Sequence, residues 1–296
     1  METTPNSNPE IRRQARRGLG IYFAFSVPLS ALIETIITSS LDSGALALVM
    51  VLMFVPAIAS VAARLILREG FADVSFRFGG LKGWMAIGMA LLFPVVIGVV
   101  AYGIAWTTGL ARFDTSADLG IGLLMGVIIG TVLTLPLAAG EELGWRGFML
   151  TRLIDSGVPR PVFMSGLIWG AWHVPIVLAG VTAAGPSPLL AVALFVVSVT
   201  SISYVIGRMR LETGSIWPAV VLHAAWDTVI LSAFDMATTG ADATLWVGES
   251  GILVALVLVA AAVILSRGEW AIIRALPTPE QSPAKRNDAY AQTRLS

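Results

Sequence analysis

Eight runs of mostly apolar residues constrain what this sequence can fold into more than any other feature. An α-helix rises about 1.5 Å per residue, so about 20 apolar residues are needed to cross roughly 30 Å of hydrocarbon. Runs on this scale occupy residues 18–40, 44–67, 83–106, 119–140, 161–181, 188–208, 214–235 and 251–267. The sequence therefore predicts an all-α, polytopic bundle of about eight transmembrane helices. The fourth helix can continue past Glu141 and Glu142.

The composition agrees with a membrane protein. The chain of 296 residues is 56% hydrophobic and 13% charged, whereas soluble domains are about 45–50% apolar and about 25% charged. We expect one membrane domain over residues 18–270, a short tail at 1–17, and a disordered, proline-containing tail at 271–296. The zero net charge gives no indication of a nucleic-acid partner, and the absence of cysteine excludes disulfides and thiolate chemistry.

The basic residues indicate how the helices are oriented, because Lys and Arg in short connections stay on the cytoplasmic side. With eight spans, 18 of the 19 Lys and Arg residues fall in or beside the two tails and the even-numbered connections, and only Arg112 falls in an odd-numbered one. We therefore predict that both ends of the chain are cytoplasmic. The localisation that follows is a multi-pass protein of the cell membrane.

A few ionisable side chains lie inside the predicted spans, where such groups cost a few kcal/mol and usually serve function. Two acids, Glu141 and Glu142, end the fourth run, and Arg146 follows. The only two histidines of the chain are His173 and His223, both inside spans.

Two further charged residues, Glu34 and Arg64, match no pattern of this kind. We expect Glu34 to pair helices or to extend toward the membrane interface, and Arg64 to extend toward that interface.

The spacing of these residues suggests shared helix faces. Glu142 and Arg146 are four residues apart and can form an ion pair, and His223 and Asp227 are also four apart. Glu141 points about 100° away from Glu142, so one acid can serve chemistry while the other anchors Arg146.

The depth of the polar groups gives an independent indication of a shared site. Counted from the predicted cytoplasmic ends, Glu141, His173, His223 and Asp227 lie roughly 13–20 Å into the membrane. A single histidine in a membrane is more often structural. Two histidines and a double Glu at one depth favour one convergent site.

Three short patterns resemble the motifs of a known family. The segment from Glu141 to Arg146 resembles the E-E-x-x-x-R motif of the CAAX protease and bacteriocin-processing (CPBP) family of intramembrane proteases. Trp169 to His173 resembles its F-x-x-x-H motif, and His223 to Asp227 its H-x-x-x-N or H-x-x-x-D motif. The order agrees, and the resemblance covers about residues 119–235.

The resemblance implies an intramembrane endopeptidase with a site that opens toward the cytoplasm. In that case Glu141 activates the attacking water with help from His173, while His223 and Asp227 stabilise the oxyanion or a metal. The substrates would be membrane-associated or CAAX-like peptides. Trp169 stands where Phe is usual, which we expect to alter packing only, and Asp227 takes the acidic alternative to Asn.

The candidate catalytic residues are those of the three motifs: Glu141, Glu142, Arg146, His173, His223 and Asp227. A Glu with two His is a known zinc ligand set, so Glu141, His173 and His223 would hold a divalent metal such as zinc if one is used. The alternative is metal-free catalysis by a glutamate base in a site of low dielectric. The sequence leaves both mechanisms open.

Two functions of other classes also fit buried acids and histidines. A transporter or proton-coupled carrier uses such groups as a proton relay, although it usually shows repeat symmetry between its halves. A non-catalytic member of the family could act as a scaffold or immunity factor. The partners predicted in the main interpretation are a membrane-associated peptide or protein substrate and the lipid bilayer.

Overall fold

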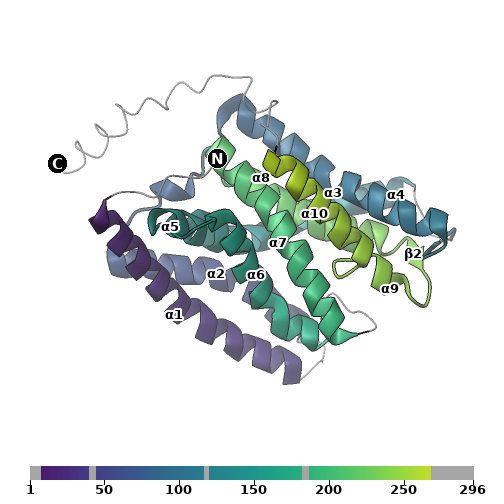
Figure 1. Cartoon of the computed structure of the whole chain (residues 1–296), viewed down its shortest axis with the longest axis horizontal. Coiled ribbons are helices and arrows are strands. Elements are labelled where there is room, and N and C mark those ends of the chain that lie inside the picture. Colours follow the sequence, from purple (N-terminus) through teal and green to yellow (C-terminus); the bar gives the residue numbers. More distant parts are fainter. Residues whose placement is uncertain (1–7, 40–44, 117–119, 182–186, 268–296) are drawn as a thin grey trace.

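The structure is a computed structural model that describes residues 8–39, 45–116, 120–181 and 187–267. Helices form nearly all of it (Figure 1). They are α1 (Pro9–Ser39), α2 (Ala45–Leu67), α3 (Gly80–Thr108), α4 (Ile121–Gly144), α5 (Leu150–Asp155), α6 (Pro161–Leu178), α7 (Pro188–Thr213), α8 (Trp217–Trp226), α9 (Ala243–Trp246) and α10 (Ile252–Arg267). Two short strands, β1 (Arg112–Phe113) and β2 (Thr238–Thr239), pair antiparallel.

The number of long apolar helices agrees with the predicted membrane bundle. Within the described part of the chain, seven helices are long and apolar enough to cross a membrane. An eighth, α10, is a shorter apolar helix of 16 residues. The fourth span continues through Glu141 and Glu142 as one helical stretch from Ile121 to Asp155, as predicted. The side of the membrane on which each end lies stays a prediction.

The structure describes part of the predicted N-terminal tail and none of the predicted C-terminal tail. Helix α1 begins at Pro9, so part of the segment that we expected to precede the first span continues that span as helix. The C-terminal segment 271–296 lies outside the described residues.

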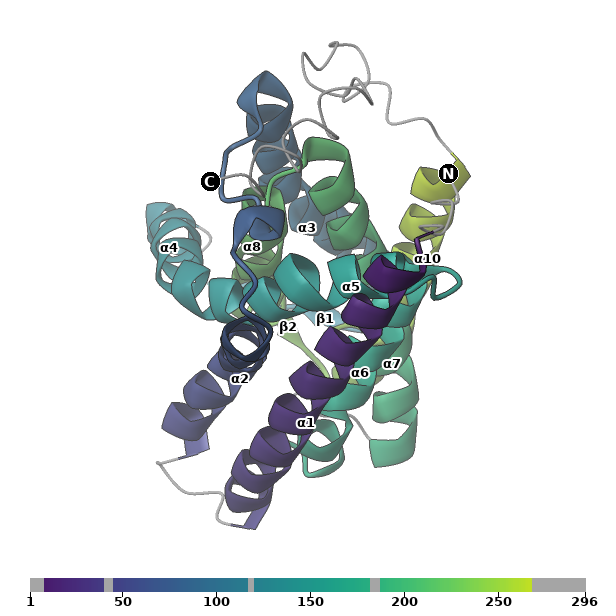
Figure 2. The ribbon, with the colours of Figure 1, turned by 90° about the vertical axis from the view of Figure 1, so that its left-hand side faces the viewer.

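Neighbouring helices pack around a shared core of aliphatic and aromatic side chains. Helix α1 lies against α2, α6 against α7, and α3 against α8 and α10. Figure 2 shows α4 at one edge of the bundle and α10 at the opposite edge. Most of the apolar window of α4 is exposed, as expected of a helix that faces lipid.

Two π-helical segments interrupt the α-helices beside the predicted motif residues. The first (Trp145–Met149) follows the two acids of α4, and the second (Asp227–Phe234) continues α8 from Asp227 onward. Such wider turns are rare and are frequently found at functional sites.

A close crossing of α4 over α2 fixes the position of the first π-helical segment. A Cβ atom on Gly144 would lie 2.3 Å from Cβ of Pro56, so only glycine permits this approach. The contact brings the acids of α4 next to α2.

A group of charged side chains, which we call the charged cap, lies at the end of the bundle where α2 ends and α3 begins. Asp73 Oδ1 lies 2.6 Å from Nη1 of Arg64, and its Oδ2 lies 2.9 Å from Nη1 of Arg152. Arg152 also pairs with Glu69 at 2.6 Å, and Arg210 donates to the backbone oxygen of Asp73 at 2.6 Å. The segment between α2 and α3 is thereby tied to α5 and α7.

Arg64 is buried inside the protein, and its extension toward the membrane interface stays a prediction. Its side chain is 1% exposed, and Nη2 donates to the backbone oxygen of Gly147 at 3.0 Å. A guanidinium has five donors, and Arg64 finds acceptors in two segments, the connection between α2 and α3 and the first π-helical segment. Glu34 is also buried, on α1.

We predict that Asp73→Asn destabilises the protein strongly. Hydrogen bonds to charged groups contribute about 1.5–3 kcal/mol, and Asp73 accepts them from two arginines. The matched control is Glu212→Gln, which removes one partner of the i,i+4 pair Arg208–Glu212 and should cost only about 0.3–0.5 kcal/mol. Thermal unfolding in detergent would measure both, and equal losses would contradict a structural role for the cap.

The loss of stability caused by Asp73→Asn should depend on pH. Partial burial raises the pKa of Asp73, but the hydrogen bond from Arg64 and the charge of Arg152 outweigh it, so the pKa lies below its ordinary value. A carboxyl of this kind stabilises the fold above about pH 4, and its contribution is lost as the pH falls through the lowered pKa. The difference between wild type and Asp73→Asn should therefore shrink in acid.

Candidate active site

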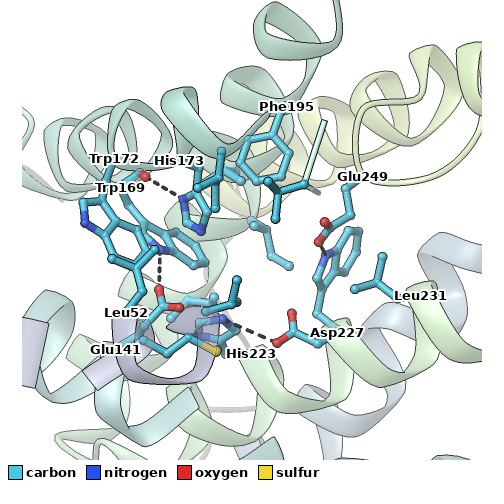
Figure 3. Close-up of a pocket in the computed structure, with 18 residues that line it drawn as sticks. Leu52, Glu141, Trp169, Trp172, His173, Phe195, His223, Asp227, Leu231 and Glu249 are labelled. Carbon is cyan, nitrogen blue, oxygen red and sulfur yellow. Dashed lines mark hydrogen bonds and ion pairs between the residues drawn. The ribbon is translucent and has the colours of Figure 1, made fainter. Parts of the chain in front are cut away.

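The predicted polar residues face one cavity of about 440 Å³ inside the bundle (Figure 3). Its ionisable lining residues are Glu141 of α4, His173 of α6, His223 of α8, Asp227 of the second π-helical segment, and Glu249 of the connection between α9 and α10. Aliphatic and aromatic side chains of α2, α6 and α7 form most of the remaining wall. A mostly apolar cavity with a few convergent polar groups is typical of a ligand or active site.

Two indoles hold the carboxylate of Glu141. Its Oε2 accepts a hydrogen bond of 2.7 Å from Nε1 of Trp169 and one of 3.1 Å from Nε1 of Trp145. Glu141 itself is 2% exposed. No hydrogen bond from the described residues engages Oε1, so this oxygen is available to a molecule in the cavity.

Our expectation that Trp169 changes packing only was therefore wrong. The indole supplies a donor that a phenylalanine lacks, and it uses that donor on Glu141. The sequence carried no signal for this bond, because Glu141 and Trp169 lie on different helices.

Glu142 and Arg146 form an ion pair behind the cavity, as their spacing predicted. Oε1 of Glu142 lies 2.7 Å from Nη1 of Arg146, and both side chains are fully buried. Arg146 also donates to Oγ of Ser203 on α7 at 2.9 Å, and its guanidinium lies 4.2 Å from the ring centre of Trp169. Neither partner of the ion pair lines the cavity.

His173 is fixed by a hydrogen bond within its own helix. Nδ1 lies 2.9 Å from the backbone oxygen of Trp169. A carbonyl only accepts, so Nδ1 must carry the proton, and in the neutral ring Nε2 has the free lone pair. Figure 3 shows the ring of His173 projecting into the cavity.

His223 stands between two carboxylates. Its Nδ1 lies 2.9 Å from Oε1 of Glu142, and its Nε2 lies 3.8 Å from Oδ2 of Asp227. The second distance is too long for a hydrogen bond. Glu142, and not Asp227, therefore fixes the orientation of the His223 ring, a contact that the sequence did not indicate.

The cavity also contains an acid that no sequence motif indicated. Glu249 accepts a hydrogen bond of 3.1 Å from Nε1 of Trp226. Figure 3 places Glu249 and Asp227 on one side of the cavity, across from Glu141 and His173. Burial raises the pKa of Glu249 to about 8, and the nearby charge of Asp227 adds to this.

The arrangement does not fit the metal site that we considered. Among the residues that the structure describes, no three His, Asp or Glu side chains come together closely enough to hold a metal ion. Glu141, His173 and His223 share the cavity without converging on one point. We derive no step through a metal.

A comparison with known families gives one match. Residues 120–229 match the family model described as type II CAAX prenyl endopeptidase Rce1-like. The matched family is the CPBP family. The match contains all three motifs and supports a multi-pass membrane protease acting on peptide substrates. No single curated protein matches the chain significantly.

We predict that the hydrogen bond from Trp169 to Glu141 contributes more to stability than a hydrogen bond between two neutral groups. Trp169→Phe removes a charge-assisted hydrogen bond, worth about 1.5–3 kcal/mol, whereas neutral bonds contribute about 0.5–1.5 kcal/mol. The matched control is Trp172→Phe, which removes the bond from another cavity indole to the hydroxyl of Ser30. The thermal midpoint in detergent should fall further for Trp169→Phe. A smaller or equal fall would mean that Glu141 gains little from this indole.

Proposed function

We propose that this protein is an intramembrane endopeptidase in which Glu141 activates the water that attacks the peptide bond. One observation carries the proposal: Glu141 faces the cavity with Oε1 unengaged by the described residues, while two indoles fix Oε2. A carboxylate that is held by one oxygen and offers the other can take a proton from water. The family match supports the same class of reaction.

His173 is proposed to assist on the same side of the cavity. Because Nδ1 donates to the backbone of Trp169, Nε2 is the atom that can accept a hydrogen bond from the attacking water. After protonation the same nitrogen can donate to the leaving amine.

His223 and Asp227 are proposed to stabilise the oxyanion that forms when water attacks. A protonated His223 ring has an Nε2–H that can donate to the oxyanion, while Nδ1–H stays bonded to Glu142. Asp227 can add a donor only in its protonated form.

We assign positioning roles to Glu142 and Arg146, which do not line the cavity. Glu142 orients His223, and Arg146 holds both Glu142 and the ring of Trp169. This arrangement fixes groups on α4, α6 and α8 relative to one another, which is what precise acid–base catalysis needs.

The substrates are proposed to be membrane-associated peptides or proteins, with CAAX-like sequences as one class. The aliphatic and aromatic walls of the cavity suit an apolar peptide side chain. The family match favours a peptidase over the carrier that we weighed, and a non-catalytic scaffold is distinguished by the variants below.

We predict that Glu141→Gln, His173→Ala and His223→Ala each abolish peptide cleavage while the protein still inserts into the membrane. Because residues that act as a unit lose most of the activity with the first substitution, a double variant should cleave hardly less than a single variant. The measurement compares peptide termini in membranes that contain the wild type or the Glu141→Gln variant. Full cleavage by Glu141→Gln would exclude the role given to Glu141.

We predict that Asp227→Asn is tolerated. Glu142 already orients His223, so Asp227 is not needed for that purpose, and an amide always offers a donor to the oxyanion. Cleavage rates of the variant should equal or exceed those of the wild type. A severe loss would show that the charge of Asp227 is essential, and metal analysis of both proteins would then test whether that charge holds a cation.

A further inference from the structure

One acid of the cavity has no part in the proposed bond cleavage. Glu249 lies in the connection between α9 and α10 and lines the cavity wall. Figure 3 shows it on the same side as Asp227, across the cavity from Glu141. A carboxyl group that faces the substrate cavity without acting on the peptide bond is a candidate for substrate recognition.

The backbone that carries Glu249 is held in place by Tyr102 of α3. The amide of Gly248 donates to the hydroxyl of Tyr102 at 3.0 Å, and this hydroxyl donates to Oδ1 of Asp235 at 2.5 Å. Gly248 has a φ of 88°, a left-handed conformation that glycine adopts without strain. The turn before Glu249 is therefore fixed by buried contacts within the protein.

The carboxyl group of Glu249 is held by one of its two oxygens. Oε1 accepts a hydrogen bond of 3.1 Å from Nε1 of Trp226, which also lines the cavity. Among the described residues, no other hydrogen bond and no ion pair engages this carboxyl group. Its Oε2 is therefore available to a molecule in the cavity.

The charge of the cavity wall is unbalanced toward acids. Glu141, Asp227 and Glu249 line it, and no Lys or Arg is among the described residues of the wall. The other ionisable groups of the wall are the two histidines, and one of them is bonded to Glu142. A cationic group of a bound molecule would therefore meet acids and no arginine or lysine.

Two other acids of this protein are paired with an arginine. Glu142 lies 2.7 Å from Arg146, and Asp73 lies 2.6 Å from Arg64. Glu249 has an indole as its partner instead. Burial and the charge of a neighbouring acid raise the pKa of Glu249 to about 8, whereas a cation beside Oε2 would favour the ionised form and lower this pKa again. A basic group of the substrate can supply that cation.

We propose that Glu249 is a specificity-determining residue that binds the positively charged side chain of a Lys or Arg in the peptide substrate. The proposal rests on the proposed function and names its substrate class, an apolar membrane-associated peptide with a basic residue near the bond that is cleaved. A cation inside a membrane is costly unless an acid pairs with it, and Oε2 provides that partner. An acidic side chain would be repelled by Glu249 and Asp227.

The experiment selects peptides by binding, so it does not depend on cleavage. Purified protein that carries Glu141→Gln is incubated in detergent with a pool of random peptides that are acetylated and amidated at their ends. The retained peptides are then sequenced by mass spectrometry. We expect Lys and Arg to be enriched at one position by about tenfold over Gln, as one charge-assisted hydrogen bond would produce.

Three further variants in the same background test whether Glu249 causes the enrichment. Glu249→Gln should remove it, because the amide oxygen can still accept from Trp226 but the charge is lost. Glu249→Asp keeps the charge one bond further from the cavity, so the enrichment should persist at a lower ratio, and this variant replaces Glu249→Gln if the latter does not fold. The matched control is Asp242→Asn, an exposed acid directly before α9, which should leave the enrichment unchanged.

The contrary results are distinct. Retention of peptides without enrichment of Lys or Arg, enrichment that Glu249→Gln leaves unchanged, or no retention of any peptide would overturn the proposal. A second pool with free amino termini tests the other source of a cation, and retention that requires the free amine in place of a basic side chain would also overturn it. Cleavage of the selected peptides by the wild type tests the peptidase separately, because peptides that bind through Glu249 and stay intact would refute only the proposed function.

Discussion

The buried ion pair between Glu142 and Arg146 organises the rest of the site. A buried pair is costly unless further hydrogen bonds satisfy both charges. Here Glu142 also accepts from His223, and Arg146 also donates to Ser203 and lies over the ring of Trp169. One pair thereby connects α4, α6, α7 and α8, and the indole that it supports in turn fixes Glu141.

The division of labour between the adjacent acids follows from helix geometry. Successive residues on a helix point about 100° apart, so Glu142 faces the protein interior while Glu141 faces the cavity. The π-helical segment that follows places Trp145 where its indole also reaches Glu141. Two adjacent acids thus have different positions: Glu142 is buried in an ion pair, and Glu141 faces the cavity.

The charged cap gathers buried arginines at one end of the bundle. Arginines that would be costly alone in a membrane are paired with acids or bonded to backbone oxygens in this cap. The segment between α2 and α3 is thereby held to α5 and α7.

Much of the architecture could be predicted because it depends on local properties of the chain. The length of the apolar runs determined the helical bundle, and the i,i+4 spacings determined the Glu142–Arg146 pair and the common face of His223 and Asp227. The motif order also indicated the family that residues 120–229 match.

Only the tertiary structure decided which groups meet across helices. The bonds from Trp169 to Glu141 and from His223 to Glu142, the burial of Arg64, and the position of Glu249 each join segments far apart in the sequence. Helix periodicity determines which way a side chain points along its own axis, but the partner depends on how two helices cross and rotate. That packing is a property of the whole bundle, so no local pattern in the sequence could specify it.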